Sequence, residues 1–350
     1  MTTVPGQEFG TAATVGAEAR RLLRADDFRG RVLAQTTGAC YLVGEDGDVL
    51  WLGTNTTPRH RRCIVVGCEL PRLPAGGAFA VRGRNLDFGQ GMQLRLRGAA
   101  VWRAPAVRAE DVLPAAAVAV ALGELYRRIC ALPDSRGLGV LIPPIMATAF
   151  TGKLRAPLAG GPLLERAFAS VAAIVEGCLC HDPAGVAKAA ASLIGLGPGL
   201  TPSGDDFVGG LAFAAHHLGK AYPAACRWDG RPIAALVAGA RARTNVVSHA
   251  ILSDLAVGHG PEPLHGLLVS LLSGRQEKDA IGRALVRLVN VGHTSGWDLL
   301  AGFLTGTLLL AGACPRPRGA FAARGDRADE RRPSSGGPVD PELAPGPELA

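Results

Sequence analysis

The residues best suited to chemistry lie in one short stretch, residues 195–211, which reads GLGPGLTPSGDDFVGGL. Ser203 is expected to cap a helix there, and Asp205 and Asp206 fall in its first turn, where the helix dipole favours negative charge. The stretch is neither a P-loop nor a dinucleotide fingerprint, because no lysine follows its glycines and no strand is predicted before it. The stretch is expected to form a loop between two helices, with its backbone exposed. We expect this loop to bind a polar group, an ammonium or a bridged metal rather than a free phosphate.

The motif of residues 203–210 recurs ninety-two positions later as residues 295–302. Both copies fit the pattern S-G-x-D-[FL]-[VL]-[GA]-G, and each helix would carry a stripe of small residues on the aspartate's face. A glycine inside a helix costs about 1 kcal/mol relative to alanine, so such stripes indicate an offsetting gain from close helix packing. The repeat therefore predicts that the two helix starts meet, with Asp206 and Asp298 near each other.

Two facing, partly buried acids would have raised or coupled proton affinities. Such a pair suits proton transfer, binding of an amide or ammonium nitrogen, or a metal. The predicted catalytic residues are Asp206, Asp298, Ser203 and Ser295. The predicted ligand-binding residues are Gly197, Gly199, Thr201, Gly204, Arg243, Asn245, Ser248, Thr294 and Gly296.

Arg243 belongs to a second polar cluster, where it would hold a carboxylate together with Asn245 or Ser248, because guanidinium offers paired donors. The alternative is that Thr244 caps the helix that contains Ser248 and that Arg243 is a surface residue. For Asp205 the expected role is ordinary helix capping.

Composition narrows the class of protein. The eight cysteines form no CxxC pair, so we expect buried free thiols in a reducing compartment and no zinc site. No cofactor is predicted, and magnesium is the one metal that Asp205 and Asp206 would suit. The net charge of +7 comes from scattered arginines, which argues against nucleic-acid binding. Without a signal peptide or a membrane span, a cytoplasmic protein is expected.

The sequence as a whole predicts an α+β protein with four parts. Residues 1–28 are a helix or extension, in which 11–28 form one short helix, and residues 29–104 are an antiparallel β domain, either sandwich or barrel. Residues 105–314 form an α-helical domain, and residues 315–350, rich in Pro, Gly, Arg and Glu, a disordered tail.

Helix patterns fill residues 105–314. The helices are expected at 115–132, 162–180, 183–194, 204–219, 231–242, 246–257, 276–290 and 296–313. In the third of these Asp182 would be the N-cap and Pro183 the first helical residue. The run LIPPI at residues 141–145 is expected to interrupt the helical sequence.

The two motifs, GLGPGLTPSGDDF at residues 195–207 and GHTSGWD at 292–298, resemble the DUF2877 family, associated with the AllH subunit of oxamate carbamoyltransferase. The resemblance spans residues 25 to 314. It implies a subunit of a multi-subunit enzyme of allantoin catabolism that interconverts oxalurate plus phosphate with oxamate plus carbamoyl phosphate. Its partners would be other subunits and a small carboxylate or carbamoyl substrate. The rival hypothesis is a non-catalytic subunit that binds a small carboxylate or assembles a multi-chain complex.

Overall fold

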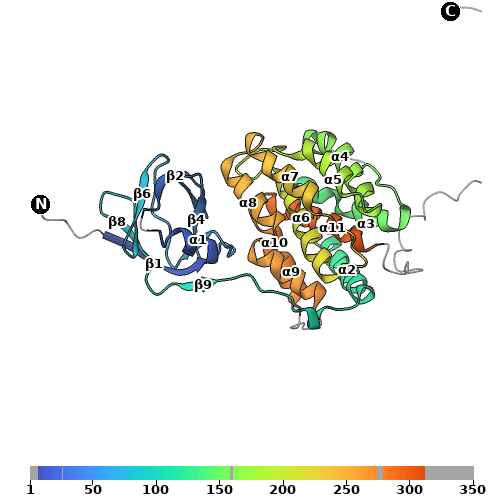
Figure 1. Cartoon of the computed structure of the whole chain (residues 1–350), viewed down its shortest axis with the longest axis horizontal. Helices are drawn as coiled ribbons and strands as arrows, with labels where there is room; N and C mark the ends of the chain where they lie inside the picture. Colours follow the sequence, from blue (N-terminus) through green and yellow to red (C-terminus); the bar gives the residue numbers. More distant parts are fainter. Residues whose placement is uncertain (1–6, 26, 158–160, 274–278, 312–350) are drawn as a thin grey trace, which may run out of the picture. The chain divides into compact units, whose positions relative to one another are not determined.

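The computed structural model describes residues 7–25, 27–157, 161–273 and 279–311 (Figure 1). Contacts divide the chain into two compact units, residues 1–315 and 316–350, and all described residues belong to the first unit. It is an α+β unit in which an N-terminal β-barrel precedes a larger helical region, so the predicted fold class is confirmed. The predicted tail, residues 315–350, lies outside the described residues.

The barrel is a closed ring of eight strands, in the order β1-β5-β4-β3-β2-β6-β7-β8 and back to β1, with β9 added beside β1. The strands are β1 (Gln7–Gly16), β2 (Arg29–Gln35), β3 (Ala39–Gly44), β4 (Val49–Gly53), β5 (Cys63–Val66), β6 (Ala78–Arg82), β7 (Asn85–Asp87), β8 (Met92–Arg95) and β9 (Ala100–Trp102). Closure leaves none of the eight ring strands with a free edge, and the ring encloses a core that includes Leu42, Leu50, Leu52 and Ile64.

Strand pairing in the barrel is mixed rather than purely antiparallel. Most neighbours are antiparallel, but β1 runs parallel to β8 and to β9, and β4 runs parallel to β5. The N-terminal segment also differs from expectation: residues 11–28 are not one helix, because β1 occupies Gln7–Gly16 and helix α1 only Ala17–Leu22. Strand β1 closes the ring, so this segment is part of the barrel.

Strands β3 and β4 form a hairpin around the Asp46-Gly47 turn and pair in antiparallel register from Ala39 and Gly53 to Val43 and Val49. Gly47 has a φ of 85°, which a glycine adopts without strain. The preceding run comprises residues 29–44. It bends at residues 36–38 and pairs with itself as β2 and β3.

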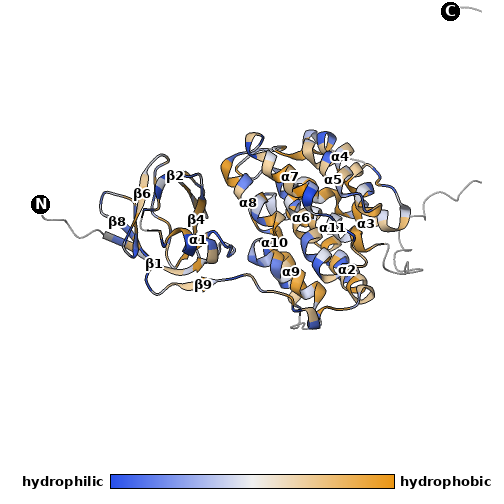
Figure 2. Cartoon of the chain, in the orientation of Figure 1, coloured by the Kyte–Doolittle hydropathy of each residue, from blue (hydrophilic) through white to orange (hydrophobic). Residues whose placement is uncertain are grey.

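Ten α-helices follow the barrel in the described part of the chain. They are α2 (Ala115–Cys130), α3 (Ile142–Thr151), α4 (Pro162–Leu179), α5 (Pro183–Ala190), α6 (Ser203–Ala221), α7 (Arg231–Gly239), α8 (Val246–Ala256), α9 (Glu262–Leu272), α10 (Ala280–Val289) and α11 (Ser295–Thr307). Hydrophobic and hydrophilic residues alternate around them (Figure 2). No helix among the described residues is long and apolar enough to cross a membrane.

Two helices differ from the sequence prediction. The run LIPPI does not interrupt a helix; Pro143 and Pro144 occupy the first turn of α3, where their missing N–H groups cost nothing. Helix α9 was not predicted at all. The other predicted helices are present, with Asp182 as the N-cap of α5 as expected, accepting from Gly185 N at 2.9 Å. Residues 276–278 of the predicted 276–290 helix and residues 312–313 of the predicted 296–313 helix lie outside the described residues.

Helices α6 and α11 form the centre of the helical region; most residues of α6 and all residues of α11 except Ser295 are buried. They touch through glycines in a reciprocal pattern. A Cβ added at Gly210 would overlap the carbonyl oxygen of Leu299, and one at Gly302 would overlap that of Phe207. Gly210 and Gly302 are equivalent positions of the repeat, and so are Phe207 and Leu299. Because each glycine contacts the equivalent residue of the other helix, the helix pair has an approximate twofold symmetry that follows the sequence repeat.

Candidate functional site

The two repeated motifs meet at the starts of α6 and α11. The hydroxyls of Thr201 and Ser295 lie 2.7 Å apart, and those of Ser203 and Thr294 lie 3.5 Å apart. Each serine therefore faces the threonine that precedes the other helix. The structure thus brings together the four hydroxyl residues of the two repeated motifs.

Ser203 does not cap its helix, which corrects the sequence prediction. Pro202 is at the N-cap position of α6, and no side chain caps the free N–H groups there. The Ser203 side chain turns instead toward Thr294 and Asp298. Ser203 is buried, whereas Thr201, Thr294 and Ser295 are half-buried and so keep some contact with solvent.

Asp206 and Asp298 lie beneath these hydroxyls, with exposed fractions of only 3% and 0%. Burial, together with the nearby Asp298 carboxyl, raises the pKa of Asp206 well above its ordinary value, although hydrogen bonds from Ser295 and Thr201 act in the opposite direction. Burial also raises the pKa of Asp298 to about 6, against the opposing effect of donors from Leu138, Ser203 and Thr294. The predicted proximity of the two aspartates is therefore found.

Each aspartate has one buried oxygen, Oδ2, without a hydrogen-bond partner among the described residues. A carboxylate with an unsatisfied buried oxygen is costly, and a protonated carboxyl is much less so. Two neighbouring buried carboxyls also avoid ionising together. The geometry consequently favours a pair that holds at least one proton near neutral pH.

Sequence reasoning missed one contributor to this site, the turn at residues 136–138. Leu138 N donates to Asp298 Oδ1 at 2.6 Å. Gly137 has a φ of 55°, and a Cβ there would overlap the same oxygen, so only glycine fits. The run Arg136-Gly137-Leu138-Gly139 in the sequence marks a turn, but nothing in it indicates which carboxylate that turn would contact.

Three glycines of the loop before α6 adopt backbone conformations that other residues rarely adopt. Gly195, Gly197 and Gly199 all have positive φ, at 77°, 120° and 92°. A Cβ at Gly197 would lie 2.8 Å from Ser203 N, whereas a Cβ at Gly199 would meet nothing within 4 Å. Gly199 is exposed, so its backbone is the part of the loop that is open to a ligand.

Gly204 and Gly296 are buried and serve helix packing. A Cβ at either position would overlap a carbonyl oxygen of the helix before it, that of Leu193 and that of Leu288 respectively. Both are equivalent positions of the repeat, so the same close approach is made twice. Their predicted role in ligand binding stays a prediction.

Asp205 ties the loop to the corner between α7 and α8 instead of capping its own helix. Its Oδ1 accepts from Gly195 N at 2.7 Å, and its Oδ2 accepts from Ser248 Oγ at 2.6 Å and from Thr244 Oγ1. The carboxylate is 1% exposed. Magnesium at Asp205 and Asp206 would have to displace these donors. No group of three His, Cys, Asp or Glu in the described ranges is arranged to hold a metal.

The second polar cluster is organised around the same carboxylate. Asn245, not Thr244, is the N-cap of α8, where its Oδ1 accepts from Val247 N at 3.1 Å and Ser248 N at 3.0 Å. The Arg243 side chain is exposed, while its carbonyl packs against Gly195. The observed contacts of Asn245 and Ser248 are therefore structural, and carboxylate binding by this cluster stays a prediction.

No solved structure matches the chain. A protein-family model described as "Oxamate carbamoyltransferase subunit AllH" matches residues 193–307, a range that contains the loop, α6, the Asn245 corner and α11. The resemblance to the AllH family that the two motifs predicted is confirmed over this range.

Proposed function

We propose that the chain is a subunit of an oxamate carbamoyltransferase-like enzyme of allantoin catabolism, which interconverts oxalurate plus phosphate with oxamate plus carbamoyl phosphate. The family match over residues 193–307 supports the class of enzyme. The observation that carries a catalytic role for this chain is the buried Asp206 and Asp298 pair beneath the half-exposed hydroxyls of Ser295, Thr201 and Thr294. Its partners under this proposal are other subunits of the same enzyme and a small carbamoyl or carboxylate substrate.

The reaction needs a proton to be moved. A phosphate oxygen bonds to the carbamoyl carbon, the bond from that carbon to the oxamate nitrogen breaks, and the nitrogen gains the proton that the phosphate loses. A carboxyl pair that shares one proton can accept it on one side and donate it on the other, so the pair is regenerated in each turnover. The raised pKa of Asp298, about 6, suits a group that exchanges protons near neutral pH.

The aspartates themselves are too buried to touch a substrate. The Ser295 hydroxyl, however, hydrogen-bonds to Asp206, lies 2.7 Å from Thr201 Oγ1 and is half-exposed. In the proposal it passes the proton between carboxyl and substrate. The open backbone around Gly199 would donate to the developing oxyanion, and the exposed Arg243 would anchor the substrate carboxylate.

A non-catalytic carboxylate-binding or assembly subunit is the second candidate. The observation in its favour is the same burial, because a neutral carboxyl pair enclosed between two helices also acts as a clamp between them. In that case another chain would perform the chemistry, and the hydroxyl surface would hold a ligand or a partner.

The test is to purify the chain alone and together with the proteins encoded beside it, and to assay phosphate-dependent cleavage of oxalurate. We expect turnover in the mixture. Replacement of Ser295 by Ala or of Asp206 by Asn should lower kcat by at least about 10²-fold, the usual contribution of acid–base catalysis. The matched control is Ser192→Ala, which removes an exposed hydroxyl that bonds to Ser170 on a neighbouring helix.

The outcomes separate the two candidates. Folded Ser295→Ala and Asp206→Asn variants that keep full turnover in the mixture would reject the catalytic role of this pair. A thermal shift of the isolated chain with oxamate, without turnover in either sample, would favour the binding subunit.

A further inference from the structure

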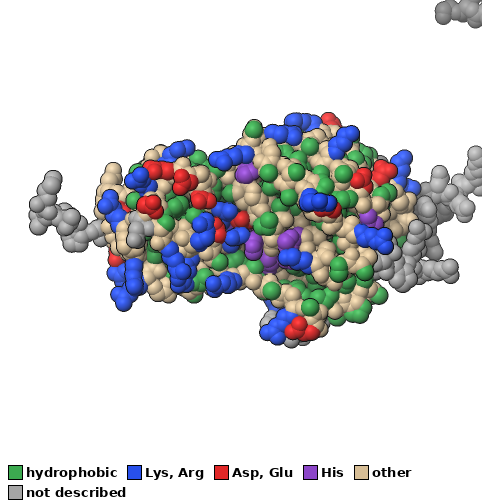
Figure 3. Space-filling model, viewed as in Figure 1, with side chains coloured by type: hydrophobic (Ala, Val, Ile, Leu, Met, Phe, Trp, Pro, Cys, Tyr) green, Lys and Arg blue, Asp and Glu red, His purple; other side chains and the backbone are tan. Residues whose placement is uncertain are grey.

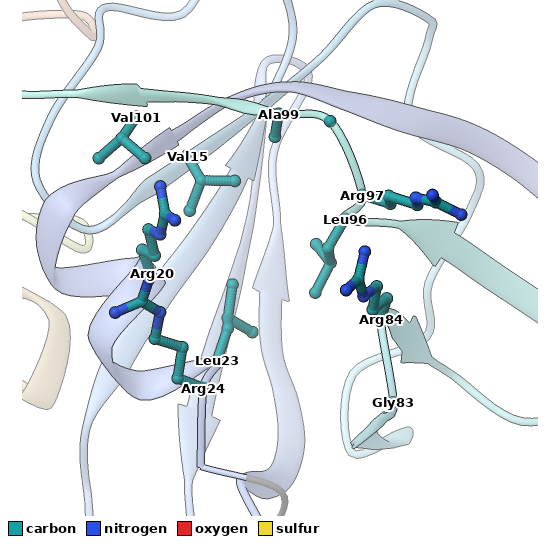
Figure 4. A pocket seen from close by; sticks show the side chains of 11 residues that line it. Val15, Arg20, Leu23, Arg24, Gly83, Arg84, Leu96, Arg97, Ala99 and Val101 are labelled. Atoms are coloured by element: carbon teal, nitrogen blue, oxygen red, sulfur yellow. The ribbon is translucent and has the colours of Figure 1, made fainter.

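A cavity of about 480 Å³ lies in the barrel and not beside the aspartate pair. It is lined by residues between Val15 and Val101, all outside the region that matches the AllH family. Figure 4 shows Arg20 and Arg24 on one side, Arg84 and Arg97 on the other, and Leu23 and Leu96 between them. The cavity therefore combines a cationic rim with an aliphatic floor.

Two separate parts of the barrel hold the four arginines in place. Arg20 and Arg24 are four residues apart, on α1 and the turn after it, so they share one face. Arg84 lies in the turn between β6 and β7, and Arg97 follows β8. These two segments are fastened together by the hydrogen bond from Leu96 N to Arg84 O, at 2.9 Å.

The four guanidinium groups are exposed, and among the described residues none of them forms an ion pair. Nearby arginines do: Arg21, Arg82 and Arg95 each hold a salt bridge with an acidic residue. The acids of this part of the barrel thus neutralise other arginines, and the cavity keeps its positive charge. Lys and Arg side chains gather around β1, β8 and β9 in Figure 3.

We propose that this cavity binds a small organic diphosphate. Guanidinium groups present pairs of donors that match phosphate oxygens, and arginines on both sides suit a ligand with more than one anionic group. The volume is in the range of small-molecule sites. Its floor is aliphatic and none of the lining residues is aromatic, which fits an aliphatic body and offers no surface on which nucleobases would stack.

The experiment measures binding to the full chain by titration calorimetry at constant ionic strength. The probes are pyrophosphate, isopentenyl diphosphate and, for comparison, acetate and a single-stranded RNA of about 20 nucleotides, which exceeds the ~4–16 nucleotides that a small barrel fold covers. The test variant is the double substitution Arg84→Gln and Arg97→Gln. The matched control is Arg31→Gln with Arg72→Gln, two exposed arginines of the same barrel that do not line the cavity.

We expect pyrophosphate to bind, isopentenyl diphosphate to bind several-fold more tightly, and acetate not to bind. The cavity variant should weaken both diphosphates at least tenfold, and the control should change them less than twofold. The proposal is overturned if pyrophosphate does not bind, if both double variants weaken binding equally, or if RNA binds more tightly than either diphosphate through Arg84 and Arg97. All these readouts are independent of carbamoyl transfer.

Discussion

At the scale of single residues, the buried Asp298 makes stability depend on pH in a definite direction. Its pKa in the folded chain is raised to about 6 from an ordinary 3.8, so the fold favours the protonated carboxyl. That contribution is complete below about pH 4 and is lost as the pH rises through 6. At about 1.4 kcal/mol per unit, the loss is about 3 kcal/mol.

Asp298→Asn should remove this dependence, because an amide keeps an oxygen for Leu138 N and cannot ionise. We expect the variant to melt higher than the wild type at pH 7.5 and at nearly the same temperature at pH 4. Thermal denaturation across this range checks it, with the exposed Asp134→Asn as control. An unchanged slope of melting temperature against pH in Asp298→Asn would contradict the prediction.

Asp205 differs from Asp298 because both of its carboxylate oxygens accept hydrogen bonds. Asp205→Ala would leave Gly195 N, Thr244 and Ser248 without their common partner. Buried unpaired donors cost about 1–3 kcal/mol each, so we expect a loss of at least 3 kcal/mol in urea denaturation. Asp182→Ala, which removes an exposed N-cap, should cost only about 1 kcal/mol. Equal losses of unfolding free energy in the two variants would show that the hydrogen bonds to Asp205 do not contribute the stability expected of them.

At the scale of elements, the stripe of glycines fixes the distance between α6 and α11. Gly302→Ala would place a methyl group on the carbonyl of Phe207 and force the helices apart, so we expect a loss of about 3 kcal/mol or more. The control is Gly123→Ala in α2, where a Cβ meets nothing within 4 Å and should stabilise the helix by up to about 1 kcal/mol. Denaturant unfolding measures both, and a Gly302→Ala variant as stable as the wild type would refute the packing argument.

The sequence predicts an element correctly where interactions between neighbouring residues alone determine its start or end. Asp182 and Pro183 predicted the start of α5 because capping involves only neighbouring residues. Strand β1 was missed because its role is to close a ring with β5 and β8, which are distant in sequence. The prolines of LIPPI have two opposite meanings, a break inside a helix and a favourable start of one, and only the position of α3 decides between them.

The same limit applies to the site. The repeat in the sequence correctly predicted that Asp206 and Asp298 lie together, since equal small-residue stripes require a common contact. It did not predict that each serine would face the other motif's threonine, or that Leu138 would donate to Asp298. Those contacts depend on the rotation of one helix against the other, which composition and spacing do not encode.

At the scale of the whole molecule, the barrel and the helical region are tied by ion pairs of two kinds. Arg62, which precedes β5, binds Asp254 of α8 through both carboxylate oxygens, with Nε–Oδ2 at 2.6 Å and Nη2–Oδ1 at 3.1 Å, and Asp254 is 3% exposed. Arg59 binds Glu262 of α9 at 3.1 Å, but its side chain is 47% exposed. Because the first ion pair is buried and the second is largely exposed, we expect them to contribute very different free energies of unfolding.

Asp254→Ala should cost about 3–5 kcal/mol, because it leaves the Arg62 charge enclosed without its partner, next to the buried His60. Glu262→Ala should cost at most about 1 kcal/mol, as exposed pairs do. Urea unfolding, followed by tryptophan fluorescence, reports on both regions at once, because Trp51 and Trp102 lie in the barrel and Trp228 and Trp297 in the helical region. If Asp254 ties the regions into one cooperative unit, its loss should separate the two fluorescence transitions, and Glu262→Ala should leave them coincident. Coincident transitions in both variants, with similar small losses, would contradict this prediction. The barrel and the helices would then be coupled by the apolar cluster that contains Trp51 and Val247, and not by the buried ion pair.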